Sequence, residues 1–86
     1  MNPTLMRALA DLAVFLTGSD DQTVDPDAAV RELETLASHL RELSDADRHA
    51  FIIYVTGTLA SESHAAGDTK RETILRKLPS DLGLLD

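Results

Sequence analysis

The chain has 86 residues, of which 43% are hydrophobic and 27% charged, and its net charge is −7. This length makes one small domain, and the apolar content is too high for a disordered protein. The absence of cysteine excludes disulfides, thiolate nucleophiles and cysteine-ligated metal centres. The negative charge disfavours phosphate backbones and anionic lipids as partners. We therefore expect a single acidic domain over residues 1–86 that binds neither nucleic acid nor membrane.

The apolar N-terminal segment is not typical of a secretion signal. Arg7 and Asp11 interrupt it, and no small-residue cleavage site follows. The longest weakly polar run, residues 50–61, is shorter than the roughly 20 residues that span a bilayer. We therefore expect a soluble protein in the cytoplasm.

The first predicted helix covers residues 3–17. Asn2 suits the cap position, Pro3 suits the first helical position, and Gly18 is expected to end the helix in a left-handed conformation. Leucines recur at the spacing of one helical face, which predicts that this face is buried: Leu5, Leu9, Leu12 and Leu16.

The second predicted helix follows an acidic connection, residues 19–24, and begins at Pro26 with Asp25 as its cap. Its apolar residues form the clearest amphipathic pattern in the chain. The predicted buried stripe consists of Ala29, Leu33, Leu36, Leu40 and Leu43.

A third helix is predicted over residues 45–64, after the capping residue Ser44. Residues 51–55 are rich in β-branched and aromatic types and would also suit a strand, but nothing else in the chain alternates with period two. A short fourth helix, capped by Asp68 or Thr69, should end before Pro79. These elements predict an all-α, four-helix bundle-like domain with antiparallel neighbours and a short C-terminal tail.

The tail, residues 80–86, is expected to be irregular and to turn at Gly83. Its leucines should dock on the domain's own helices, because exposed leucines on so small a protein would promote aggregation. The alternative is a short peptide presented to a partner. The leucines in question are Leu82, Leu84 and Leu85.

The first connection approaches the spacing of a calcium-binding loop at Asp21, Thr23, Asp25, Asp27 and Glu32. Pro26 stands where such a loop requires glycine, so we expect a surface loop without a cation. A second set of metal-compatible side chains lacks paired-histidine spacing and predicts no metal site. It consists of His39, Glu42, Asp45, His49 and His64.

Signatures of catalysis are missing as well. The chain has neither a nucleophile elbow nor a glycine-rich phosphate loop, so we expect no cofactor and no enzyme. A small metal-dependent enzyme is the least favoured alternative. Half of the basic residues lie on the last predicted helix, where we expect a solvated face rather than a nucleic-acid contact: Lys70, Arg71, Arg76 and Lys77.

The third predicted helix carries the main functional expectation. Residues 50–60 include no charge, and a helix that is apolar all round is a buried helix. In a domain of four short helices, the other three can scarcely cover all sides of this helix. We therefore expect a second copy to cover its remaining face across a two-fold axis. The sequence thus predicts a non-enzymatic protein–protein interaction domain that forms a homodimer. The expected self-association residues are Ile53, Tyr54 and Gly57.

An alternative function follows from the acidic residues. A small immunity-type inhibitor would use them to bind a basic partner such as a nuclease toxin, and their charge would speed the encounter. The simpler interpretation is that they cap helices and line a solvated loop. The candidate contacts are Asp20, Asp21, Asp25, Asp27, Asp45 and Asp47.

Overall fold

The computed structural model describes residues 1–85, which form four helical segments and no strand. The all-α fold class is therefore confirmed. The third segment is one continuous rod whose middle part is π-helical. The elements are α1 (Pro3–Gly18), α2 (Pro26–Arg41), α3 (Asp45–Ile53), η1 (Tyr54–Leu59), α4 (Ala60–Ala65) and α5 (Thr69–Asp81).

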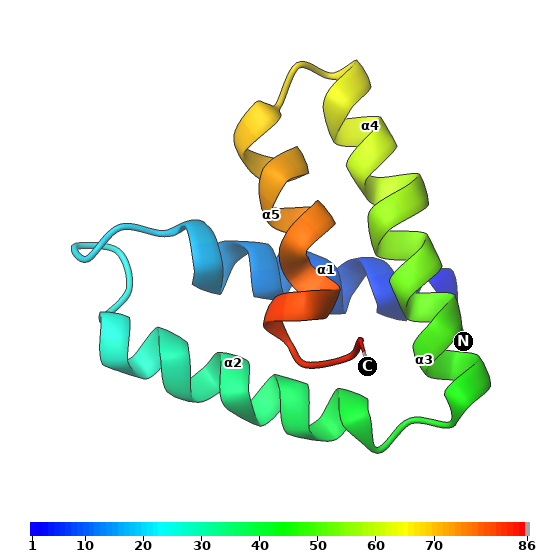
Figure 1. Cartoon of the computed structure of the whole chain (residues 1–86). Helices are drawn as coiled ribbons and strands as arrows, with labels where there is room; N and C mark the ends of the chain where they lie inside the picture. The colour runs from blue at the N-terminus through cyan, green and yellow to red at the C-terminus, as the bar shows by residue number, and fades with distance from the viewer. Residues whose placement is uncertain (86) are drawn as a thin grey trace.

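The helices form two antiparallel hairpins that lie across each other (Figure 1). One hairpin consists of α1 and α2, and the other of the rod α3–η1–α4 and α5. Helix α1 crosses behind α5 in this view and packs against both α5 and η1, whereas α2 packs chiefly against α1. The two helical segments within each hairpin are antiparallel, as expected. The bundle is formed where the two hairpins cross.

The predicted helix starts are confirmed by their capping hydrogen bonds. At each start a side-chain oxygen accepts a backbone N–H of the first turn, at 2.7 to 3.1 Å. Such a bond satisfies a donor that would otherwise have no partner, and is worth about 1 kcal/mol. The capping residues are Asn2, Asp25, Ser44 and Asp68.

The buried cluster combines large side chains from the second hairpin with small ones from the first. The rod contributes Phe51, Val55 and Leu59, all of which are almost completely buried. Opposite them, α1 contributes Met6, Ala10 and Ala13. Further members come from α2, from α5 and from the residues after it: Ala37, Leu40, Leu75, Leu78, Leu82 and Leu84.

The prediction that the leucine stripe of α1 is buried is wrong. Leu5 and Leu12 are exposed, while Leu9 and Leu16 are only partly covered. The second hairpin instead meets the neighbouring alanine face of α1, where short side chains let the helix backbones approach. Because α1 is apolar over a broad arc, its periodicity does not show which part of that arc receives the contact.

The predicted left-handed conformation of Gly18 is also wrong. Gly18 is the last helical residue of α1, and Ser19 closes the helix by donating its N–H and its Oγ–H to the Phe15 carbonyl. A Cβ atom on Gly18 would lie 3.0 Å from Ile74 Cδ1, and Lys70 Nζ donates to the Gly18 oxygen at 2.7 Å. Glycine is therefore suited to this position by the close approach of α5.

Helix α5 does not end before Pro79, as predicted, but continues to Asp81. The chain then turns at Gly83, whose φ is +69°. Gly83 N donates a hydrogen bond to Ser80 O, and Leu84 N donates one to Pro79 O. This pair of bonds is a Schellman motif. The motif uses the carbonyl of Pro79, so it does not depend on the backbone N–H that proline lacks.

The Schellman motif determines which of the tail leucines point toward the core. Leu82 and Leu84 are buried against the cluster, which confirms the prediction for these two residues. Leu85 is 54% exposed, so the prediction is wrong there. The chain turns back at Gly83 and brings Leu84 inward, and the next side chain then points outward. Asp86, also placed in the tail, lies outside the described residues.

The helical prediction for residues 45–64 is confirmed, and the alternative of a strand is wrong. Its π-helical stretch has a wider turn than an α-helix and contains Gly57. This glycine is exposed, and a Cβ atom built on it would meet no heavy atom within 4 Å.

We expect Gly57→Ala to stabilise the protein. Alanine loses less backbone entropy than glycine in a helix, so the free energy of unfolding should rise by about 0.5 to 1 kcal/mol. The melting temperature should rise by several degrees. Gly67→Ala is the matched control and should lower it, because Gly67 has a φ of +76°. A Gly57→Ala protein that melts below the wild type would contradict this prediction.

The tail provides a second matched pair of variants. Leu84→Ala should lower the free energy of unfolding by about 2 to 3 kcal/mol, because Leu84 packs in the cluster. Leu85→Ala should change it by less than about 0.5 kcal/mol, since Leu85 is exposed. Urea unfolding measures both. A negligible effect of both variants would show that the tail is not part of the packed fold.

Candidate interaction surfaces

An apolar surface runs along the side of α1 that the second hairpin does not cover. Its three large side chains are 49% to 58% exposed, and contiguous exposed apolar surface of this kind marks interaction sites. The fourth member, an alanine, is exposed as well. We call this surface the α1 outer face and define it by Leu5, Ala8, Leu12 and Phe15.

Shallow grooves lie on both sides of this face. The groove toward α2 has a volume of about 240 Å³ and is lined by Leu12, Leu16, Glu32, Thr35, Leu36 and His39. The groove toward α5 has a volume of about 280 Å³ and includes Val14, Phe15 and Ile74. The α1 outer face is therefore a ridge that another surface can reach from either side.

The two charged residues of α1 both contact the second hairpin. Arg7 Nη2 lies 3.0 Å from Glu62 Oε2, and Asp11 Oδ1 lies 2.6 Å from Arg71 Nη2. The hydrogen bond from Arg7 to Glu62 and the charge of this glutamate raise the pKa of Arg7. Because both charges have partners within the chain, the α1 outer face itself is uncharged.

The residues predicted to mediate self-association lie on α3 and η1, and the structure brings only some of them together. Ile53 is 55% exposed, and Gly57 is exposed about one turn further along the rod. Tyr54 is half-buried and packs against the hydrophobic cluster instead. The outward surface of the rod therefore presents one large apolar side chain at this point, whereas the α1 outer face presents three.

The six candidate acidic contacts fall into two groups. Residues 20–27 contain four of them, in the connection before α2 and at its start, whereas Asp45 and Asp47 lie in the first turn of α3. The two groups are at opposite ends of α2 (Figure 1), a helix of 16 residues that is about 24 Å long. The structure therefore does not join them into one acidic patch.

Several of these aspartates have local roles. Asp20 Oδ1 accepts hydrogen bonds from the backbone N–H groups of Gln22 and Thr23, and the bonding to Thr23 is the main reason why the pKa of Asp20 is lowered. Asp25 caps α2, and Asp45 pairs with Arg48 at 2.6 Å. The sequence-based interpretation as caps and a solvated loop accounts for Asp20 and Asp25, whereas Asp45 forms an ion pair within the first turn of α3.

The basic residues of α5 mostly contact their own chain. Lys70 binds the carbonyl of Gly18, Arg71 binds Asp11, and Arg76 contacts Glu72 at 2.9 Å. Glu72 also contacts His64 Nδ1 at 3.0 Å. The hydrogen bonds with His64 and then with Arg76 lower the pKa of Glu72. These side chains tie α5 to α1 and α4, a role that the sequence did not reveal.

The metal-compatible residues noted in the sequence are dispersed. Within residues 1–85, no three histidine, aspartate or glutamate side chains are grouped so that they could hold a metal ion. The same part of the chain contains no helix with the length and apolar character needed to cross a bilayer.

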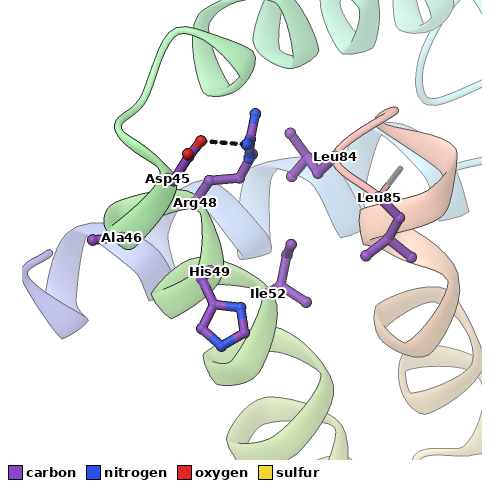
Figure 2. Close-up of a pocket in the computed structure, with 7 residues that line it drawn as sticks. All are labelled: Asp45, Ala46, Arg48, His49, Ile52, Leu84 and Leu85. Carbon is purple, nitrogen blue, oxygen red and sulfur yellow. Dashed lines mark hydrogen bonds and ion pairs between the residues drawn. The ribbon is translucent and has the colours of Figure 1, made fainter.

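The largest hollow, of about 560 Å³, lies between the start of α3 and the C-terminal tail (Figure 2). Among the residues that line it, Asp45 and Arg48 form an ion pair, while His49 points away from that pair. Ile52 and the tail leucines supply its apolar side. No sequence pattern indicates this hollow, because it forms where the Schellman motif folds the tail back toward α3.

Comparison with known proteins adds no relative from which a role could be transferred. The chain matches no family model, no curated protein and no solved structure. Any functional conclusion therefore depends on the surfaces described above.

The contacts of Glu72 predict a pH dependence. A carboxylate whose pKa is lower in the folded than in the unfolded protein stabilises the fold above about pH 4.3, and this stabilisation is lost as the pH falls through the folded-state pKa. We therefore expect Glu72→Gln, which cannot ionise, to be less stable than the wild type near neutrality and to lose less stability on acidification. Urea midpoints between about pH 6 and pH 3 measure this difference. If the urea midpoints of the wild type and of Glu72→Gln fell in parallel as the pH is lowered, this prediction would be contradicted.

Proposed function

We propose that this protein is a non-enzymatic protein–protein interaction domain whose partner is a second copy of itself. The observation that carries the proposal is the α1 outer face, where Leu5, Leu12 and Phe15 are about half exposed. Covering this face would remove apolar area from water, which is worth about 25 cal/mol for each Å². Association with another protein surface is the most direct way to cover it.

The shape of this surface favours a protein over a small ligand. Small-molecule sites are concave and place a few polar groups around an apolar cavity. The α1 outer face is instead the convex side of a helix and carries no charge. Such faces commonly pack against another helix or a groove, with contacts every three or four residues.

The residues that the sequence indicated, Ile53, Tyr54 and Gly57, provide a second possible interface. It has the exposed Ile53 at its centre and no bulky residue at Gly57 to hinder an approaching helix. Its apolar area is smaller, because Tyr54 is partly used in the protein's own core. We therefore place the interface on α1 rather than on the rod.

Inhibition of a basic protein is the alternative function. It is supported by the exposed aspartates around the start of α2: Asp20, Asp21, Asp25 and Asp27. A partner that binds there would not be in contact with Asp45 and Asp47 at the same time unless it reached along the whole of α2. Binding of this kind would weaken as salt is added, since it depends on charge.

Light scattering at several protein concentrations tests the proposal. The wild type should show a mass that rises from that of a monomer toward that of a dimer. Leu12→Glu should remain monomeric, because a charge would have to be buried at the interface. Ile53→Glu is the matched control, with similar exposure on the other hairpin, and should associate like the wild type.

Circular dichroism should show that both variants keep the wild-type helix content, since both side chains are largely exposed. A wild type that stays monomeric at all concentrations would refute self-association. Loss of the dimer in Ile53→Glu but not in Leu12→Glu would place the interface on the rod instead.

A further inference from the structure

The α1 outer face has the pattern of a short coiled-coil seam. Its members, Leu5, Ala8, Leu12 and Phe15, follow one another at steps of three, four and three positions. These are the steps between the a and d positions over two heptads. The residues buried in the protein's own core, among them Ala10 and Ala13, lie on another side of the same helix. Helix α1 thus has one apolar face for the intramolecular core and a second one that residues 1–85 leave exposed.

We infer that two copies pair along α1 in antiparallel orientation, with Leu12 of each copy packed over Ala8 of the other. This inference rests on the proposed self-association and specifies its geometry. A two-fold axis would pass between the pairs and close the assembly as a dimer, because the same face is used by both copies.

Side-chain size favours the antiparallel orientation. In this register the large Phe15 of one copy meets Leu5 of the other, and the large Leu12 meets the small Ala8. A parallel pairing would set Ala8 against Ala8 and Phe15 against Phe15, which leaves a void in one layer and crowds another. Voids and overpacking both destabilise an apolar contact, so the antiparallel register packs better.

Charge favours a second copy over a charged partner. Arg7 and Asp11 are already paired with Glu62 and Arg71 of the same chain, so the seam offers a basic protein nothing to bind electrostatically. The four residues of the seam bring no charged side chain together when two copies meet, although Glu32 lines the groove beside Leu12. The net charge of −7 still causes a general repulsion between copies, which salt screens beyond about 8 Å at physiological strength. Added salt should therefore maintain or strengthen this dimer.

The available area limits the strength of the dimer. Helix α1 has 16 residues and is about 24 Å long, and with a helix diameter of about 10 Å its footprint is roughly 240 Å² per copy. Stable complexes bury about 800 Å² per partner. Contacts in the flanking grooves add some area, but the pairing remains small. We therefore expect a reversible dimer that dissociates on dilution rather than a permanent one.

Disulfide cross-linking tests this register, because the chain has no cysteine of its own. Ala8→Cys and Leu12→Cys proteins are prepared separately, mixed and oxidised. Disulfides form only when the Cα atoms come within about 7 Å of each other. In the mixture, a disulfide should form between one Ala8→Cys protein and one Leu12→Cys protein. This cross-link should form about ten times faster than a disulfide between two copies of either variant alone. Ile53→Cys, on the other hairpin, is the control and should cross-link no faster than by random collision.

The outcomes separate the register from the proposed function. Faster cross-linking of Ala8→Cys with itself would overturn the antiparallel register in favour of a parallel one. A dimer in light scattering whose Ala8→Cys and Leu12→Cys proteins cross-link neither with each other nor with themselves would overturn the α1 seam and leave self-association intact. A monomeric wild type at every concentration and salt level would overturn both. Reduced cysteine variants are first checked by light scattering, so that a loss of association caused by the substitution is recognised.

Discussion

The close contact between the alanine face of α1 and the second hairpin determines most of this structure. Ala10 and Ala13 have no exposed surface, and the large side chains of the rod and of α5 fill the space against them. Gly18 continues this contact at the end of α1, where Ile74 and Lys70 leave little room for a Cβ atom. Because small residues set the helix spacing, the larger leucines of α1 are displaced to its outer side. The exposed α1 outer face is thus a direct consequence of how the core is packed.

The same contact explains the basic residues of α5. Once α5 lies against α1, Arg71 reaches Asp11 and Lys70 reaches the last carbonyl of α1. Exposed ion pairs of this kind contribute little to stability individually. The pair of Arg71 with Asp11, together with the pair of Arg7 with Glu62 of α4, engages both charged side chains of α1 within the chain, and the α1 outer face has no charged member. Two members of the basic cluster that the sequence predicted to be a solvated face, Lys70 and Arg71, thus take part in the packing between the hairpins.

The candidate aspartates and the α1 outer face occupy different parts of the fold. The aspartates lie near the two ends of α2 and the α1 outer face runs along α1, although Glu32 of α2 lines the groove beside Leu12. Strong net charge disfavours indiscriminate association, while an uncharged apolar face permits association with one matching surface. This separation is consistent with a domain that binds a specific partner and otherwise remains dispersed. It also means that an interface on α1 and a basic protein bound near the start of α2 would not compete for the same residues.

The local chemistry of the chain determined where its helices begin, that they are helices, and how the tail turns at Gly83. Caps at Asn2, Asp25, Ser44 and Asp68 depend on hydrogen bonds within a few residues, so the sequence is sufficient to predict them. Only the tertiary structure decided which part of the apolar arc of α1 is buried, that α5 continues through Pro79, and that Tyr54 belongs partly to the core. It also placed the aspartates in two groups. These features depend on contacts between residues far apart in the chain, and hydrophobic periodicity identifies an apolar face without identifying what will cover it.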